Sequence, residues 1–132
     1  LLAIFPIADA GSERAAARAA IEAAHEALDA IAGLHDTPLL AGEPPLRVVV
    51  ALHVGEVFYG NIGSSQRLDF TVIGPAVNLV SRAAEAAKTL DVDLILTDAL
   101  AAAYGGAVER LGTFRLRGLA GERALFTPRP ER

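Results

Sequence analysis

The segment HVGEVFYGNIGSSQRLDFTVIGPAVNLVSR, residues 53 to 82, restricts the possible folds more than any other part of the chain. Residues 56–62 are suited to a strand, residues 60–65 have the composition of a turn, and residues 67–73 alternate apolar and polar side chains as a half-buried strand does. Gly74 and Pro75 then end this strand and begin a helix, since Pro is tolerated in a first helical turn. The sequence therefore predicts a β-hairpin followed directly by a helix.

A long helix is predicted ahead of this segment. Residues 13–34 are rich in Ala, with Ile21, Leu28 and Ile31 at helical spacing, and Asp9 and Ser12 are candidate N-caps. Gly and Pro residues between positions 36 and 45 predict a loop.

The other apolar runs predict strands. We expect strands at residues 1–5, at 46–54 with both faces buried, at 93–96, and at 108–111, 113–116 and 124–127. Thr97 or Asp98 is expected to cap a short helix that ends at Gly105 and Gly106. Strands that alternate with helices in this way predict an α+β fold with helices packed on a mixed sheet.

Composition excludes several functional classes. The chain has 132 residues, 52% of them hydrophobic, and a net charge of −4, which suits one soluble domain and argues against contact with nucleic acid or an anionic membrane. The absence of Cys excludes disulfides, a cysteine nucleophile and a thiolate zinc site, and it fits the cytoplasmic location that we expect. Because the sequence has no Met and opens on a run typical of a buried strand, we expect it to be a piece of a longer protein.

Two polar residues on the helix after Pro75 are candidates for binding an anion. Asn78 and Arg82 are four residues apart, which places them on one face near the helix N-terminus, where negative charge is favoured. The alternative is a solvent-exposed polar stripe, which the same spacing produces more often. The three histidines are poor catalytic candidates, and His53 is expected to be a core residue with its polar atoms satisfied.

The same segment closely resembles the signature of the class III nucleotide cyclases, the catalytic domain of adenylate and guanylate cyclases. The resemblance covers nearly the whole chain and is strongest between residues 46 and 90, so that residues 1–127 form a partial cyclase domain and 128–132 a tail. A diguanylate cyclase is a weaker alternative, because its signature is absent. The matching motifs are Gly60-Asn61-Ile62-Gly63, residues 67–74, Val77-Asn78-Leu79, Ser81-Arg82, the opening LLAIFP and TFRLRGL around residue 117.

The resemblance implies a ferredoxin-like βαββαβ cyclase fold that lacks its first strand and metal-binding hairpin. It also implies conversion of ATP to 3′,5′-cyclic AMP and pyrophosphate by attack of the ribose 3′-OH on the α-phosphorus. In that reaction Asn78 would orient the ribose and Arg82 would stabilise charge on the α-phosphate. Thr71 and the backbone of Val72 would contact the purine, and Arg117 would bind the β- and γ-phosphates.

Cofactors and partners follow from the same resemblance. Family members use two Mg²⁺ or Mn²⁺ ions, held by two Asp residues that are expected upstream of Leu1, so no metal ligand is assigned within this chain. They form head-to-tail homodimers in which two protomers share each active site. Alone, the chain is expected to have little or no activity. The alternative function is a catalytically inactive, cyclase-like regulatory or dimerisation module.

Overall fold

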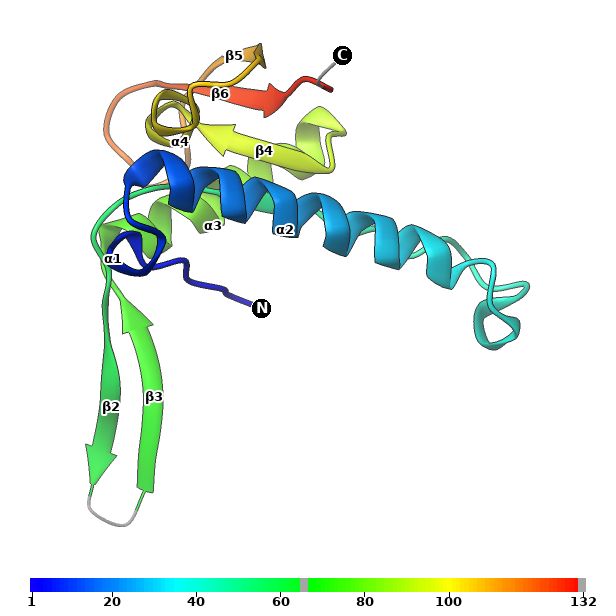
Figure 1. The fold of residues 1–132 in the computed structure, drawn as a ribbon, viewed down its shortest axis with the longest axis horizontal. Helices are drawn as coiled ribbons and strands as arrows, with labels where there is room; N and C mark the ends of the chain where they lie inside the picture. Colours follow the sequence, from blue (N-terminus) through cyan, green and yellow to red (C-terminus); the bar gives the residue numbers. More distant parts are fainter. Residues whose placement is uncertain (65–66, 131–132) are drawn as a thin grey trace.

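The computed structural model describes residues 1–64 and 67–130, which contain four α-helices and six strands (Figure 1). The helices are α1 (Ile7–Ala10), α2 (Glu13–Leu34), α3 (Pro75–Leu90) and α4 (Asp98–Tyr104), with a 3-10 turn at Pro38–Leu40. The strands are β1 (Val50–Leu52), β2 (Phe58–Ser64), β3 (Arg67–Ile73), β4 (Leu94–Thr97), β5 (Val108–Phe114) and β6 (Arg123–Pro128).

Four of these strands form one mixed sheet in the order β1-β4-β6-β5. β1 and β4 are parallel, whereas β6 is antiparallel to both β4 and β5. Parallel neighbours need a crossover connection, and here the chain between β1 and β4 contains the β2–β3 hairpin and α3. The predicted α+β fold with a mixed sheet is confirmed.

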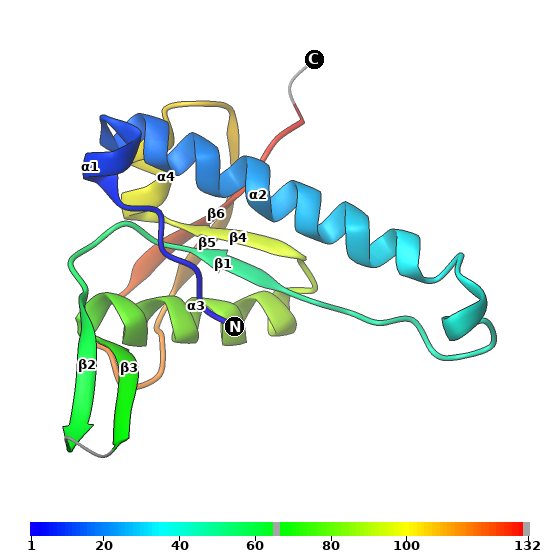
Figure 2. The same ribbon diagram turned by 60° about the horizontal axis from the view of Figure 1, so that its bottom comes forward.

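Helices cover both faces of the sheet, with α2 and α4 on one side and α3 on the other (Figure 2). The alternation of side chains along β4 explains how one short strand serves both layers. Leu94 and Leu96 pack into the cluster with α2 and α4, and Ile95 between them packs into the cluster with α3. All four residues of β4 are buried, so this strand is the centre of the core.

The long helix agrees with its prediction at both ends. Ser12 caps α2, with its hydroxyl oxygen accepting a hydrogen bond from the backbone N–H of Ala15 at 3.1 Å. The buried residues of α2 all lie between Ala16 and Ala24, and the second half extends beyond the sheet (Figure 1). Asp9 is not the cap of α2, because it lies inside the separate short helix α1.

The β2–β3 hairpin is a separate two-stranded sheet that projects away from the rest of the molecule (Figures 1 and 2). Its strands pair in continuous antiparallel register from Phe58 with Ile73 to Ser64 with Arg67. β3 has the predicted bounds, whereas β2 begins and ends two residues later than predicted. The reason is that pairing with β3 continues through Gly60 to Ser64, where composition alone predicts a turn. Residue 65, the last of that predicted turn, lies outside the described residues, as does residue 66.

Four strand predictions are wrong in extent or kind. Residues 1–5 form no strand and are exposed, because a strand needs a partner for its backbone groups and no described strand pairs with them. β1 is only three residues long and partly buried, since it is an edge strand paired with β4 alone. The two strands predicted at 108–116 are one strand, β5, with a bulge between Arg110 and Gly112, where the φ of +143° at Gly112 favours glycine.

Truncation of Leu125 tests the layer between the sheet and α3. Leu125 is fully buried beside Ile95 and Leu116. We expect Leu125→Ala to lower the free energy of unfolding by about 2–5 kcal/mol, because the packed neighbours leave a cavity. The measurement is urea denaturation followed by circular dichroism. Leu39→Ala, at a side chain that is 90% exposed, is the matched control and should change stability little; equal losses in both variants would contradict this packing.

Candidate functional site

The candidate site is built around the start of α3. Gly74 is the N-cap and Pro75 the first helical residue, as the sequence predicts. The φ of +139° at Gly74 is a conformation that L side chains rarely adopt, and a Cβ there would lie 3.3 Å from the carbonyl oxygen of Glu56. The glycine therefore allows α3 to begin directly against the base of the hairpin.

A second glycine brings His53 against the same region. A Cβ at Gly55 would lie 2.9 Å from both Nε2 of His53 and the Cβ of Ala76, in the first turn of α3. Only a residue without a side chain fits between these groups. The ring of His53 and the first turn of α3 therefore both lie close to the backbone of Gly55.

The other ring nitrogen of His53 is bound to the core. Its Nδ1 lies 2.8 Å from the hydroxyl of the fully buried Thr97. That hydroxyl oxygen already accepts a hydrogen bond from the backbone N–H of Leu100 at 3.3 Å and caps α4, so its hydrogen is available for Nδ1. The hydrogen bond to Thr97 satisfies Nδ1 of His53, a ring that is partly buried.

The surroundings of His53 favour its neutral form. Burial lowers the pKa of His53 below its ordinary value of 6.5, and the Arg123 cation lowers it further, while Asp98 opposes the shift. Arg123 and Asp98 are themselves paired, with Nη2 of Arg123 donating to Oδ1 of Asp98 at 3.1 Å.

This shift predicts a loss of stability in weak acid. As pH falls below 6.5, the unfolded chain binds a proton at His53 before the folded protein does, so the free energy of unfolding decreases until the lowered folded pKa is reached. We expect thermal melts between about pH 7.5 and about pH 5 to show a steeper decrease in Tm for the wild type than for His53→Gln. His25→Gln, at an exposed histidine of α2, is the control and should keep the wild-type change of Tm with pH. If His53→Gln also kept the wild-type change of Tm with pH, His53 would not be the cause of the acid sensitivity.

Arg82 lies in a pocket of about 240 Å³ between α3 and the segment that follows β5. On the helix side, the lining residues recur at helical spacing along one stripe of α3, from Arg82 through Glu85 and Ala86 to Thr89. We call this the arginine pocket, because three arginines and one glutamate line it. The lining residues are Arg82, Glu85, Ala86, Thr89, Leu90, Phe114, Arg115, Leu116 and Arg117.

The other two arginines come from the segment after β5. Leu116 is buried against α3, whereas Arg115 and Arg117 on either side of it are exposed. Anchoring of Leu116 in the core therefore places both cations at the mouth of the pocket. The structure thus brings Arg82 and Arg117, both site candidates from the sequence, into one pocket.

The remaining candidates lie outside the described lining of this pocket. Asn78 is exposed on α3, one helical turn before Arg82. Val72 is partly buried in the hairpin and pairs with Tyr59. The backbone of Thr71 pairs with Gly60, and its side chain is outside the described residues.

Arg115 and Glu85 are pocket residues that the sequence analysis did not select. Both carry a signal in the sequence: Arg115 is two residues from Arg117 in an alternating run, and Glu85 is three residues after Arg82 on the same helix. Nη1 of Arg82 donates to Oε1 of Glu85 at 2.8 Å. The pocket still contains more positive than negative charge, which favours an anion.

A second pocket of the same volume has a different electrostatic character. It is lined by Arg47, Val49 and Lys88. Arg47 forms ion pairs with Asp91 and Asp93. The hydrogen bond from Arg47 to Asp91 raises the pKa of the Arg47 guanidinium above its ordinary value. The two carboxylates neutralise this cation, so the pocket is a weaker candidate for binding an anion.

Among the side chains of residues 1–60 and 72–130, no three from His, Cys, Asp and Glu are grouped so that they could hold a metal ion. No helix in this part of the chain is long and apolar enough to span a bilayer.

Comparison with known proteins gives the fold and its relatives. The crystal structure of the guanylyl cyclase Cya2 superimposes with a TM-score of 0.69 over 87% of this chain and 58% of that chain, at 24% identity. The chain therefore has the fold of a nucleotide cyclase domain. No protein-family model matches the sequence.

Two curated relatives give the sequence relationship. An adenylate cyclase of Anabaena cylindrica is 36% identical over 59 residues, which are 45% of this chain and 12% of that protein. Adenylate cyclase 1 of Rhizobium meliloti is 29% identical over 115 residues, which are 86% of this chain and 17% of that protein. The chain is thus similar in sequence to two proteins named adenylate cyclase and in fold to a guanylyl cyclase, and it spans less than a fifth of the length of the two curated relatives.

Proposed function

We propose that this chain is part of an adenylate cyclase domain that acts in intracellular signalling and converts ATP to 3′,5′-cyclic AMP and pyrophosphate. The observation that carries the proposal is the arginine pocket, in which Arg82 and Arg117 meet although 35 positions separate them in the sequence. Arginine binds phosphate oxygens through paired N–H donors and stays charged at all physiological pH values. A volume of about 240 Å³ suits a polyphosphate group, with the nucleoside outside the pocket.

Each residue has a role that its position permits. Arg82 stabilises the negative charge that develops on the α-phosphate, and Arg117 binds the β- and γ-phosphates. Asn78, on the same face of α3 as Arg82 and nearer the hairpin, orients the ribose. Thr71 and the backbone of Val72, at the end of β3, contact the purine and favour ATP over GTP.

Two Mg²⁺ or Mn²⁺ ions are proposed as cofactors of the complete site. The described side chains include no group of three that could hold a metal ion, so no step is assigned to a metal and none of these residues is given a metal role. The 132-residue chain on its own is proposed to have little activity.

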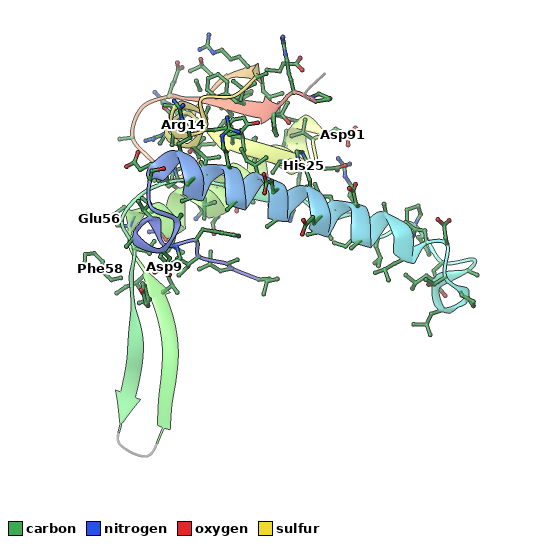
Figure 3. All side chains as sticks on the ribbon, viewed as in Figure 1. Asp9, Arg14, His25, Glu56, Phe58 and Asp91 are labelled. Carbon is green, nitrogen blue, oxygen red and sulfur yellow. The ribbon has the colours of Figure 1, made fainter. Side chains whose placement is uncertain are left out.

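A homodimer with shared active sites is also proposed. The hairpin exposes large apolar side chains where it leaves the sheet, with Phe58 64%, Tyr59 57% and Ile73 52% exposed. Figure 3 places Phe58 at this base, close to Glu56 in the segment that leads into β2. Exposed apolar side chains gathered in this way are typical of protein interfaces.

Removal of Arg82 tests the reaction. We expect Arg82→Ala to reduce cyclic AMP formation from ATP and Mn²⁺ by about 100-fold or more in the full-length protein, because a cation facing the transition state is lost. The measurement is the initial rate of cyclic AMP formation. Arg129→Ala, at an exposed arginine after β6, is the matched control and should keep the wild-type rate. Equal rates in wild type and Arg82→Ala would remove Arg82 from the mechanism.

The alternative is a catalytically inactive regulatory or dimerisation module with the same fold. It predicts no cyclic AMP formation by the wild type with either Mg²⁺ or Mn²⁺, together with intact self-association. The cyclase proposal predicts cyclic AMP formation that depends on Arg82, so the rate of cyclic AMP formation distinguishes the two functions.

Self-association is tested at the base of the hairpin. We expect Phe58→Ser to raise the dissociation constant of the dimer about tenfold or more in sedimentation equilibrium, since an exposed aromatic anchor is lost. Leu39→Ser removes an even more exposed apolar side chain from the loop after α2 and should have no effect. A wild type that stays monomeric at all concentrations would contradict the dimer.

A further inference from the structure

Glu85 is an acidic side chain within the cationic arginine pocket. It lines the pocket together with Arg82, Arg115 and Arg117, and its carboxylate accepts the hydrogen bond from Nη1 of Arg82 at 2.8 Å. A carboxylate opposes the binding of any anion in its vicinity, because like charges repel. Glu85 therefore opposes the binding of phosphate in this pocket.

The ion pair between Glu85 and Arg82 is of a kind that an anion can displace. The two residues are three positions apart on one helix, and their side chains are 53% and 31% exposed. Solvent screens such pairs, and both long side chains lose conformational freedom when they are held in one geometry. A polyphosphate offers Arg82 more negative charge and more acceptor oxygens than one carboxylate does.

The position of the pair also limits where the guanidinium can go. Arg82, Glu85 and Thr89 all line the pocket from one stripe of α3, so a guanidinium held by Glu85 stays at the pocket when no anion is present. The same carboxylate then remains close to any phosphate that Arg82 binds. Glu85 thus has two effects. It holds the guanidinium of Arg82 at the pocket, and it weakens the binding of an anion there.

We propose that Glu85 is a positioning residue that acts as a counter-charge: it holds Arg82 at the pocket in the absence of ligand and lowers the affinity of the pocket for polyphosphate. The ligand class is a pyrophosphate or the triphosphate group of a nucleotide. This inference rests on the proposed function, in which pyrophosphate is a product that must leave the pocket. Glu85 keeps its binding weak enough for release.

The test measures the affinity for inorganic pyrophosphate by isothermal titration calorimetry at fixed ionic strength. We expect Glu85→Gln to bind pyrophosphate about three- to tenfold more tightly than the wild type, because one negative charge near the ligand is removed. Glu85→Asp, which retains the charge, should stay near the wild-type affinity. Glu22→Gln makes the same change of charge on an exposed part of α2 outside the pocket and should also stay near it.

Several results would overturn the proposal. They are an unchanged or weaker affinity in Glu85→Gln, an equal gain in Glu22→Gln, and no pyrophosphate binding by either wild type or Glu85→Gln. Added salt should reduce the difference between wild type and Glu85→Gln, because solvent-exposed charges are screened. A purely structural role of Glu85 predicts lower stability without tighter binding.

Failure of the proposed function gives a different result. If Glu85→Gln binds pyrophosphate more tightly but the full-length protein makes no cyclic AMP, the cyclase reaction is wrong and the counter-charge stands. If cyclic AMP forms and Glu85→Gln changes neither the KM for ATP nor the pyrophosphate affinity, only the role of Glu85 is wrong.

Discussion

Close contact between α3 and the sheet is the constraint on which the rest of the structure depends. Ala83 and Ala87 are fully buried and pack against Ile95 and Leu125. Small side chains at these positions let the helix approach the strands, and larger ones would create overpacking. With this face fixed, helical geometry directs the neighbouring stripe that begins at Arg82 toward the segment after β5. The arginine pocket is therefore a consequence of how the core packs.

The predictions from sequence succeed where local signals and tertiary packing agree. α2 has the predicted bounds because an Ala-rich amphipathic pattern and a capping Ser12 point to the same helix. β3 and the start of α3 succeed for the same reason, since alternation ends at a Gly-Pro pair. The relationship to nucleotide cyclases, which the motifs between residues 60 and 82 carry, is confirmed by the relatives and by the fold.

The failures arise where the structure depends on a partner that sequence pattern does not supply. Residues 1–5 are as apolar as a buried strand, yet a strand forms only where another strand satisfies its backbone. In β2 the opposite happens, and pairing with β3 extends through residues of poor strand propensity. At the candidate site, the motifs indicate Arg82 and Arg117 one at a time. That Arg115 and Glu85 line the same pocket depends on the packing of α3 against Leu116, which no motif shows.

Gly74 has a consequence for how the hairpin and α3 can vary. This residue is both the end of the hairpin and the N-cap of α3, and its φ of +139° sets the direction of each relative to the other. Other residues would be strained in that conformation, and a Cβ there would also lie 3.3 Å from the carbonyl oxygen of Glu56. A substitution at Gly74 would therefore disturb the projecting hairpin and the helix that carries Asn78 and Arg82 together.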